Sequence, residues 1–352
     1  MSGKARGGEP KARAVGPRLA AAGMVMLVVL GGIPQEVSAA MAEPAAAIAD
    51  LIERLGNVTN ATAFRYGARD DRGAPLDCLK ILELGPGDYL GVYHALREKV
   101  FHLHVARSTN LLEWRRVATL DEHASQGSLW RGSNGVFLVA YERDTPRAAN
   151  VRLRHYENLA ALQAGKFSRE FDAPRTLAPS AEGTPSFERV AWGGVPERSR
   201  IDLRLHYYRD QKADRAATGT MFGFTNWVAA PDPAINAPLE ARGVAGNIGD
   251  RDRFEWGGRG YLLQEAQMRS RDWTSWRLYL FDAQTMELWP VEVRTHRGSR
   301  SFANPTVTPL HDGRGVELLA VTLFLPAQGS APSEAGTLIY VVPGAAPART
   351  QP

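Results

Sequence analysis

The chain has a single cysteine, Cys78, so no disulfide can form within it, and its 352 residues depend on a buried apolar core. Because Cys78 lies in the apolar run 76–84, we expect a buried thiol rather than a nucleophile. The sequence also lacks a glycine-rich phosphate loop, a G-x-S-x-G nucleophile elbow and the Cys/His spacing of a zinc site. These absences argue against P-loop nucleotide, serine-hydrolase and structural-zinc chemistry.

An excess of charge of one sign is also missing. The formal net charge is +4, from 42 Lys and Arg against 38 Asp and Glu, and five of the basic residues fall within the first 18 positions. The rest of the chain is close to neutral and has no concentrated basic segment. Nucleic-acid binding needs such a basic face, so we expect no nucleic-acid partner.

Long hydrophobic runs are absent as well. The apolar run at 19–30 is shorter than the ~20 residues that a membrane-spanning helix needs. Basic residues precede it and small residues follow at 37–42, which is the pattern of a cleavable signal peptide. An uncleaved anchor is the alternative. We expect a signal peptide at 1–42, a secreted protein (extracellular or periplasmic), and no membrane association after cleavage.

A short helix and an all-β body are expected after the signal peptide. Residues 44–55 have helical spacing and end at Gly56, and no helix longer than two turns is indicated beyond them. Short apolar runs at β spacing follow, separated by Gly, Pro, Asn and Asp. We therefore predict a helix and linker at 43–62, one β domain at 63–345, a flexible tail at 346–352, and a monomer.

The β body consists of five approximate units that begin roughly every 50–65 residues. Each unit starts with a polar or acidic residue, followed by a strand, a tight glycine turn and two further strands. The starts are Asp77, Gln126, Glu182, Asp250 and Asn304. This spacing favours a five-bladed β-propeller, in which the starts of the inner strands converge on a central channel. A β-sandwich is the alternative fold.

Three segments resemble the five-bladed propellers of the arabinanase, levansucrase and invertase superfamily, especially family-43 glycoside hydrolases. They are residues 106–114, similar to a stretch that ends a blade in that family, the turn and strand at 258–263, and Glu182-Gly183-Thr184-Pro185, similar to its general-acid element. The resemblance implies that Glu182 is the general acid and Asp77 the base. The structural alternative is that Glu182 accepts backbone amides in the turn before Pro185.

The chain departs from the family pattern at two of these positions. Cys78 follows Asp77 where the family has Asp-Pro, and Ser125-Gln126 places no carboxylate at the start of the second unit. Asp250 or Asp252 could replace the missing carboxylate. Two functions stay open: glycoside hydrolysis, and glycan binding without catalysis. Two carboxylates within roughly 5–10 Å in one cleft would indicate the enzyme. A Glu182 that stands alone or points between blades would indicate the binding protein.

Polar and aromatic residues near the unit starts are candidates for holding a sugar. The densest charged segment, Asp250-Arg251-Asp252, could bind sugar hydroxyls or a cation, or could tie two loops together. Tryptophans near turns offer faces on which sugar rings stack. The predicted substrate-binding residues are Gln126, Arg251, Asp252, Asn304, Trp192, Trp256 and His206. We predict a carbohydrate ligand, no metal-ligand set and no cofactor, although the channel could hold a structural calcium ion.

Overall fold

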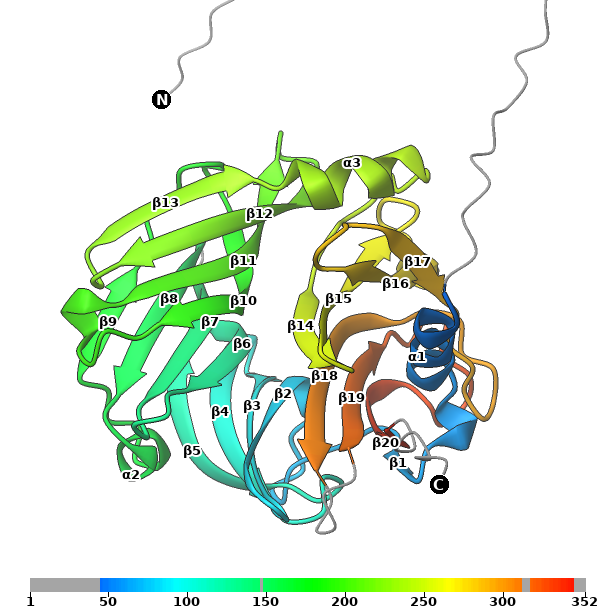
Figure 1. Ribbon diagram of the computed structural model, residues 1–352, viewed down its shortest axis with the longest axis horizontal. Coiled ribbons are helices and arrows are strands. Elements are labelled where there is room, and N and C mark those ends of the chain that lie inside the picture. The colour runs from blue at the N-terminus through cyan, green and yellow to red at the C-terminus, as the bar shows by residue number, and fades with distance from the viewer. Residues whose placement is uncertain (1–44, 146–147, 312–316, 345–352) are drawn as a thin grey trace, which may run out of the picture. The chain divides into compact units, whose positions relative to one another are not determined.

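The computed structural model describes residues 45–145, 148–311 and 317–344, which form a five-bladed β-propeller (Figure 1). The predicted signal peptide and C-terminal tail lie outside the described residues. Each blade is an antiparallel sheet of four strands. The predicted unit starts coincide, within two residues, with the first residues of the five inner strands. The propeller prediction is therefore confirmed, and the β-sandwich alternative is wrong.

The blades follow one another along the chain, and the strands of each are given from the inside outward. Blade 1 is β2 (Asp77–Gly85), β3 (Asp88–Arg97), β4 (Val100–Ser108) and β5 (Arg115–Glu122). Blade 2 is β6 (Ala124–Arg131), β7 (Phe137–Thr145), β8 (Ala148–Tyr156) and β9 (Arg169–Asp172). Blade 3 is β10 (Glu182–Ala191), β11 (Arg200–Arg209), β12 (Ala213–Phe222) and β13 (Asn226–Pro231). Blade 4 is β14 (Arg251–Trp256), β15 (Arg259–Gln267), β16 (Trp276–Asp282) and β17 (Leu288–Val291). Blade 5 is β18 (Ala303–His311), β19 (Glu317–Leu325), β20 (Gly336–Pro343) and β1 (Ala63–Arg65).

The alternation of apolar and polar residues explains why these segments form strands that pack blade on blade. In β11, Ile201, Leu203 and Leu205 are buried while the residues between them are half-buried. Side chains at every second position of a strand point to the same face. These three side chains therefore join one apolar cluster with residues of blade 2, such as Leu138. The hydrophobic core accordingly lies largely between neighbouring blades.

The ring is closed by a strand from the beginning of the described chain. β1 pairs antiparallel with β20, so residues from both ends of the domain complete blade 5 and cover an otherwise free sheet edge. This strand is too short to have been predicted from the sequence. The predicted helix is present as α1 (Ala46–Gly56), and its Leu51 and Leu55 pack into the core shared by blades 4 and 5.

Two further α-helices in the described residues were not predicted, the five-residue α2 (Leu159–Gln163) and the longer α3 (Pro233–Ala241). α3 (Pro233–Ala241) lies between blades 3 and 4 and has nine residues, or about two and a half turns. Asp232 caps it by accepting the Ala234 N–H at 3.1 Å, and Pro233 is its first residue. The expectation of no later helix above two turns is therefore wrong. A stretch with only Ile235 and Leu239 as large apolar residues was too short to show helical periodicity.

All five inner strands begin at one end of the central channel, which we call the channel mouth. The pairing is antiparallel, so the second strand of each blade ends there, as in the pair Asp77 and His94. Four inner strands carry a β-bulge at this end with a non-glycine residue at positive φ, between 47° and 53°. These residues are Cys78, Gln126, Thr184 and Asn304. Such conformations are unfavourable for ordinary residues and persist where surrounding contacts hold them.

Candidate functional site at the channel mouth

A pocket of about 400 Å³ opens at the channel mouth between blades 1, 2 and 3, and we call it the mouth pocket. It combines three carboxylates and two imidazoles with aromatic and small side chains, and its lining contains no Lys or Arg. The lining residues are His94, Phe101, Ser125, Gln126, Glu142, Asp144, Ala181, Thr184, His206, Tyr208 and Asp214. Of the predicted substrate-binding residues, Gln126 and His206 lie here.

Two of these carboxylates flank one imidazole. The His206 Nε2 atom lies 3.6 Å from Asp214 Oδ1 and 4.0 Å from Glu142 Oε2. Since both oxygens lie within 4.0 Å of one nitrogen, they are at most about 8 Å apart. Glycoside hydrolases hold their two carboxyl groups roughly 5–9.5 Å apart. The spacing of Glu142 and Asp214 is compatible with that range.

Glu142 enters the pocket because residue 183 is a glycine. A Cβ atom at Gly183 would lie 1.9 Å from Glu142 Oε2, which is closer than atoms can approach. With that space open, Glu142 Oε2 accepts the backbone N–H of Thr184 at 3.0 Å. The glycine of the family-like element thus makes room for a carboxylate from the preceding blade.

The surroundings of Glu142 favour its protonated form. Burial raises the pKa of Glu142, and the nearby charges of Asp144 and Asp214 raise it further, while His206 and the Thr184 N–H lower it. The surroundings of His94, in contrast, favour its neutral, unprotonated form. Burial, followed by the charge of His104, lowers the pKa of His94 to about 4, so its imidazole is neutral near pH 7. Its Nδ1 accepts the N–H of Gln126 at 3.1 Å.

The channel below the mouth is closed by protein side chains. Its cavity, lined by Cys78, Gln126 and residues of all five blades, has room for no more than about one water molecule. Lys80 of blade 1 forms an ion pair there with Asp252 of blade 4, and Arg251 Nη1 donates to the Thr184 carbonyl at 2.7 Å. A sugar can therefore reach the mouth but not the channel interior.

The three predicted catalytic residues lie in separate environments. Glu182 is 2% exposed, and its Oε1 accepts the backbone N–H groups of Thr176, Leu177 and Ala178. Among the described residues, no hydrogen bond or ion pair joins Glu182 to Asp77 or Asp250. This geometry matches the structural alternative for Glu182, a carboxylate that holds the loop before β10.

The other two carboxylates also bond to protein groups. Asp77 accepts a hydrogen bond from Thr337 Oγ1 of β20 at 3.1 Å, and burial raises its pKa. Asp250 is buried beside Glu265, and burial raises its pKa too. Neither residue lines the mouth pocket.

The remaining predicted substrate-binding residues are distributed over the fold. Asn304 Nδ2 donates to Gln126 Oε1 at 3.4 Å, which places it beside the pocket. Arg251 and Asp252 are buried in the channel, and Trp256 is 8% exposed within the core of blades 4 and 5. Trp192 follows β10 and lies at the opposite end of the propeller from the mouth. Buried side chains such as Trp256 offer no surface for a sugar.

Sequence reasoning missed Glu142, Asp144 and Asp214. It searched the starts of inner strands, whereas these residues lie on second and third strands, 72 positions apart from first to last. One signal was present for Glu142. It directly follows the apolar run 136–141. Carboxylates are rarely buried without a partner, so a Glu at the end of a buried strand indicates a specific contact or function.

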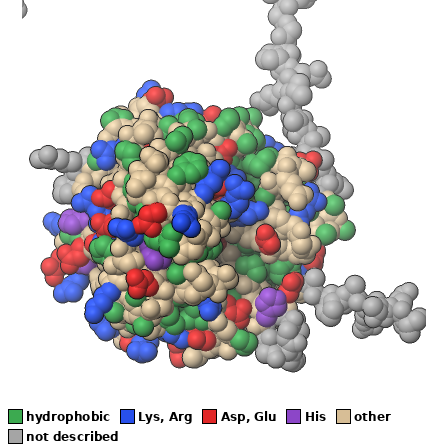
Figure 2. Space-filling view, turned by 60° about the vertical axis from the view of Figure 1, so that its left-hand side comes forward, with side chains coloured by type: hydrophobic (Ala, Val, Ile, Leu, Met, Phe, Trp, Pro, Cys, Tyr) green, Lys and Arg blue, Asp and Glu red, His purple; other side chains and the backbone are tan. Residues whose placement is uncertain are grey.

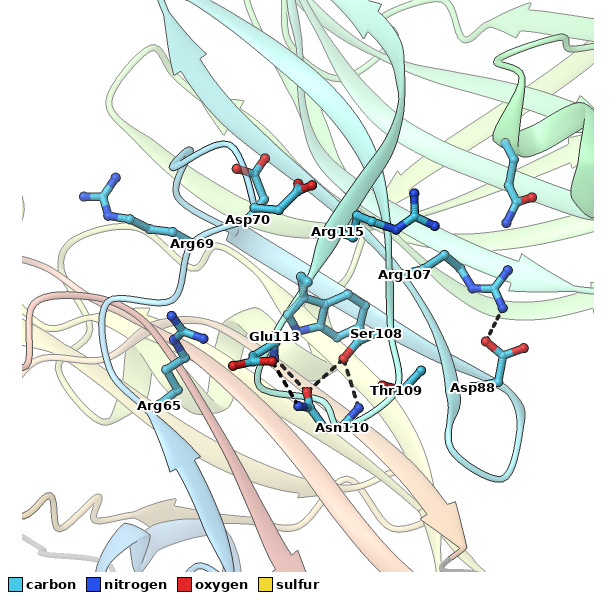
Figure 3. Close-up of a pocket in the computed structure, with 13 residues that line it drawn as sticks. Arg65, Arg69, Asp70, Asp88, Arg107, Ser108, Thr109, Asn110, Glu113 and Arg115 are labelled. Atoms are coloured by element: carbon cyan, nitrogen blue, oxygen red, sulfur yellow. Dashed lines mark hydrogen bonds and ion pairs between the residues drawn. The ribbon is translucent and has the colours of Figure 1, made fainter.

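A larger pocket, of about 730 Å³, is lined mainly by blade 1 (Figure 3). It includes the family-like segment 106–114, which forms a tight turn stabilised by its own side chains. Ser108 Oγ accepts the Leu111 N–H at 2.9 Å, and Asn110 Oδ1 accepts the Glu113 N–H at 2.9 Å. Arg107 pairs with Asp88, as the dashed line in Figure 3 shows. The segment therefore has a clear structural role.

The described residues show neither a surface region of one charge sign in the view of Figure 2 nor a cluster of metal ligands. Figure 2 shows acidic and basic side chains intermixed over one face. No group of three or more His, Cys, Asp or Glu side chains in the described ranges is arranged to hold a metal ion. Within the same ranges, no helix has both the length and the apolar character needed to cross a membrane.

Comparison with known proteins identifies the fold. No protein-family model matches the sequence, and no curated protein matches it either. Among solved structures, a glycoside hydrolase matches with a TM-score of 0.58 at 14% identity, covering 85% of this chain and 96% of that chain. A thermostable family-43 glycoside hydrolase matches with a TM-score of 0.54 at 12% identity, covering 79% of this chain and 92% of that chain. The α-L-arabinofuranosidase PaAbf62A from Podospora anserina, in complex with cellotriose, matches with a TM-score of 0.50 at 10% identity. The match covers 82% of this chain and 96% of that chain.

The chain has the five-bladed fold of these glycoside hydrolases. At such low identity the likeness concerns the fold, and function has to be argued from the site itself.

Proposed function

We propose that this protein is an exported carbohydrate-active enzyme that hydrolyses a glycan in the mouth pocket. Glu142 is the general acid and Asp214 is the second carboxylate. The observation that carries the proposal is the pair of carboxylates near His206 Nε2, at 3.6 Å and 4.0 Å, in an open pocket. Export rests on the N-terminal sequence pattern, and N-terminal sequencing of the secreted protein should give a start near residue 43.

The assignment of roles follows from the raised pKa of Glu142. Glycoside hydrolysis requires one protonated carboxyl group, which donates to the leaving glycosidic oxygen, and one ionised carboxylate. The raised pKa of Glu142 keeps its proton available closer to neutral pH, as a general acid requires. Asp214 then accepts a proton from the attacking water or attacks the anomeric carbon itself. Phe101 and Tyr208 in the pocket lining supply aromatic surface for the sugar ring.

Glu182 is the alternative acid that the family resemblance suggests. To act as one, its carboxyl group would have to turn away from the three backbone N–H groups that its Oε1 accepts and reach the mouth pocket, which it does not line. Of the three, the N–H of Ala178 is buried, and a buried N–H left without an acceptor costs roughly 1–3 kcal/mol. Glu142 needs no such rearrangement, which is why we assign the acid role to it.

Glycan binding without hydrolysis is the second candidate function. It is favoured by the four positive-φ positions at the channel mouth, which carry Cys78, Gln126, Thr184 and Asn304 and no carboxylate. They are the second or third residues of four inner strands, at the end where these strands converge on the axis. A propeller that had kept the pocket and lost its catalytic carboxylates would carry uncharged residues at these four positions.

Hydrolysis of aryl arabinosides, aryl xylosides, aryl galactosides and fructose oligomers tests the proposal. The mature protein is compared with the Glu142→Gln and Glu182→Gln variants and with Glu98→Gln, a matched control at an exposed turn. We expect turnover to fall at least about 100-fold in E142Q and to persist in E182Q and E98Q. Loss of turnover in E182Q, with E142Q active, would assign the acid to Glu182. Glycan-array binding without any turnover would establish the binding function.

A further inference from the structure

A second pocket, of about 440 Å³, lies between blades 2 and 3 at the end opposite the channel mouth. We call it the Trp192 pocket. Its position follows from strand direction: β8 ends at Tyr156 and β10 ends at Ala191, both far from the starts of the inner strands. The residues that matter here are Val136, His155, Arg169, Trp192, Val195 and Glu197. None of them lines the mouth pocket.

The floor of this pocket is a pair of stacked rings. The His155 imidazole lies over the Trp192 indole with 5.0 Å between centroids and 17° between planes, and Trp130 packs against Trp192 at 6.4 Å. This aromatic cluster is backed by the core of blades 2 and 3. It therefore forms a rigid, flat surface whose position is fixed from behind.

Two polar atoms of the floor have no hydrogen-bond partner among the described residues. His155 is 5% exposed, its Nδ1 pairs with Ser168 Oγ at 2.6 Å, and its Nε2 is unpaired. Trp192 Nε1 is unpaired as well. Buried polar groups normally find partners, so two unpaired ones on residues that line one pocket favour a ligand with hydroxyl groups, for which these shielded atoms have to become accessible.

The rim adds groups of both charge signs. Arg169 Nη2 of blade 2 pairs with Glu197 Oε1 of blade 3 at 2.5 Å, across the gap between the blades. Val136 and Val195 line the pocket beside this pair, and Val195 is 44% exposed. An aromatic floor with apolar walls and a polar rim matches one ligand class well. A sugar ring presents an apolar C–H face for stacking and hydroxyl groups at its edge.

We propose that the Trp192 pocket is a second carbohydrate site that binds a neutral sugar unit of a glycan chain. The lining also contains Glu157 beside the Arg169–Glu197 pair, and this excess of carboxylates argues against an anionic ligand. Because the pocket lies at the opposite end from Glu142 and Asp214, it holds the polymer without taking part in bond cleavage. The proposal stands on its own observations and does not depend on hydrolysis at the mouth.

Affinity electrophoresis of the mature protein in gels containing soluble arabinan, xylan or galactan tests this site. We expect Trp192→Ala to weaken binding of at least one of these polysaccharides about tenfold or more, with turnover of a small aryl glycoside unchanged. Trp273→Ala is the matched control, because Trp273 is 47% exposed on another blade. Since Trp192 contacts the core, the surface double variant Arg169→Gln/Glu197→Gln provides a second test in which folding is not at risk.

Two outcomes would overturn the second site. One is unchanged binding of all three polysaccharides in both the Trp192→Ala and the double variant. The other is polysaccharide binding that disappears in Glu142→Gln and persists in Trp192→Ala, which would place all binding at the mouth. A direct readout is the indole N–H resonance of Trp192, assigned by its absence in Trp192→Phe. We expect this resonance to shift on titration with an oligosaccharide from the bound polymer, while that of Trp273 does not.

Discussion

Glu142 on the second strand of blade 2 accepts the backbone N–H of Thr184 at the start of the inner strand of blade 3, at 3.0 Å. The same relationship joins two other pairs of blades. His94 accepts the N–H of Gln126, and Glu265 accepts the N–H of Asn304. In each pair, a polar side chain of one blade holds the positive-φ residue that begins the next blade. At Glu142 this structural contact and the proposed catalytic role fall on one residue.

Replacing Glu182 should reduce stability rather than catalysis. Glu182→Ala leaves the N–H groups of Thr176, Leu177 and Ala178 without their acceptor, so we expect the free energy of unfolding to fall by about 2–4 kcal/mol. Glu182→Gln keeps one carbonyl oxygen in place and should lose less. Urea unfolding followed by circular dichroism gives both values. A Glu182→Ala protein within ~0.5 kcal/mol of the wild type would show that these hydrogen bonds contribute little.

Replacing Gly183 should displace Glu142 from the mouth pocket. The added Cβ of Gly183→Ala would lie 1.9 Å from Glu142 Oε2, so the carboxylate has to move. We expect kcat/KM to fall toward the level of Glu142→Gln while the protein stays folded. Gly85→Ala is the control, because a Cβ there meets no atom within 4 Å. Equal activity of the Gly183→Ala and Gly85→Ala proteins would remove Glu142 from the mechanism.

The pH dependence of activity should report the environment of Glu142. A general acid must be protonated, so kcat/KM falls as the pH rises through its pKa, and a raised pKa moves this fall to higher pH. The charge of Asp144 contributes to the raised pKa. Asp144→Asn removes that charge, so the alkaline limb of the pH profile should move to lower pH. A limb that stays in place, or moves upward, would assign it to another group.

Much of the fold could be predicted because each blade repeats its own local signals. The alternation in β11 and the glycine turns between strands recur at regular spacing, and each signal needs only a few neighbouring residues. Ring closure by β1 could not be predicted in this way. Its three residues pair with β20, more than 270 positions later, and no local pattern encodes that contact.

The candidate site was less predictable for a related reason. Glu182 was singled out by its place in a familiar sequence element, and the structure shows that its carboxylate serves the loop beside it. Glu142, His206 and Asp214 come from three strands, and only their register brings them together. The orientation of a side chain at a strand start depends on a bulge, which changes the face on which the following residues lie.

Glu265 should make the stability of the propeller depend on pH. Burial, followed by the charge of Asp250, raises the pKa of Glu265 from 4.5 to about 8. Between these two values the folded protein holds a proton that the unfolded chain has lost. The stabilisation is therefore complete below pH 4.5 and disappears as the pH rises through 8, with a slope of at most ~1.4 kcal/mol per pH unit.

The free energy of unfolding, measured in urea at pH 5, 6, 7 and 8, tests this dependence. Glu265→Gln cannot titrate, so its stability should change less over this range than that of the wild type. Burial also lowers the pKa of Lys80 to about 8, which affects stability in the opposite direction only above that pH. Inside the window from pH 5 to 8, His94 and His104, whose pKa values burial lowers from 6.5 to about 4, make stability rise with pH up to about 6.5, so the contribution of Glu265 is read from the difference between the wild type and Glu265→Gln, in which the histidine contributions cancel. Asp250→Asn should also flatten the curve, because it removes the charge that helps raise the pKa of Glu265. Parallel curves for the wild type and Glu265→Gln would mean that Glu265 is ionised in the folded protein, held so by the N–H groups of Asp250 and Asn304.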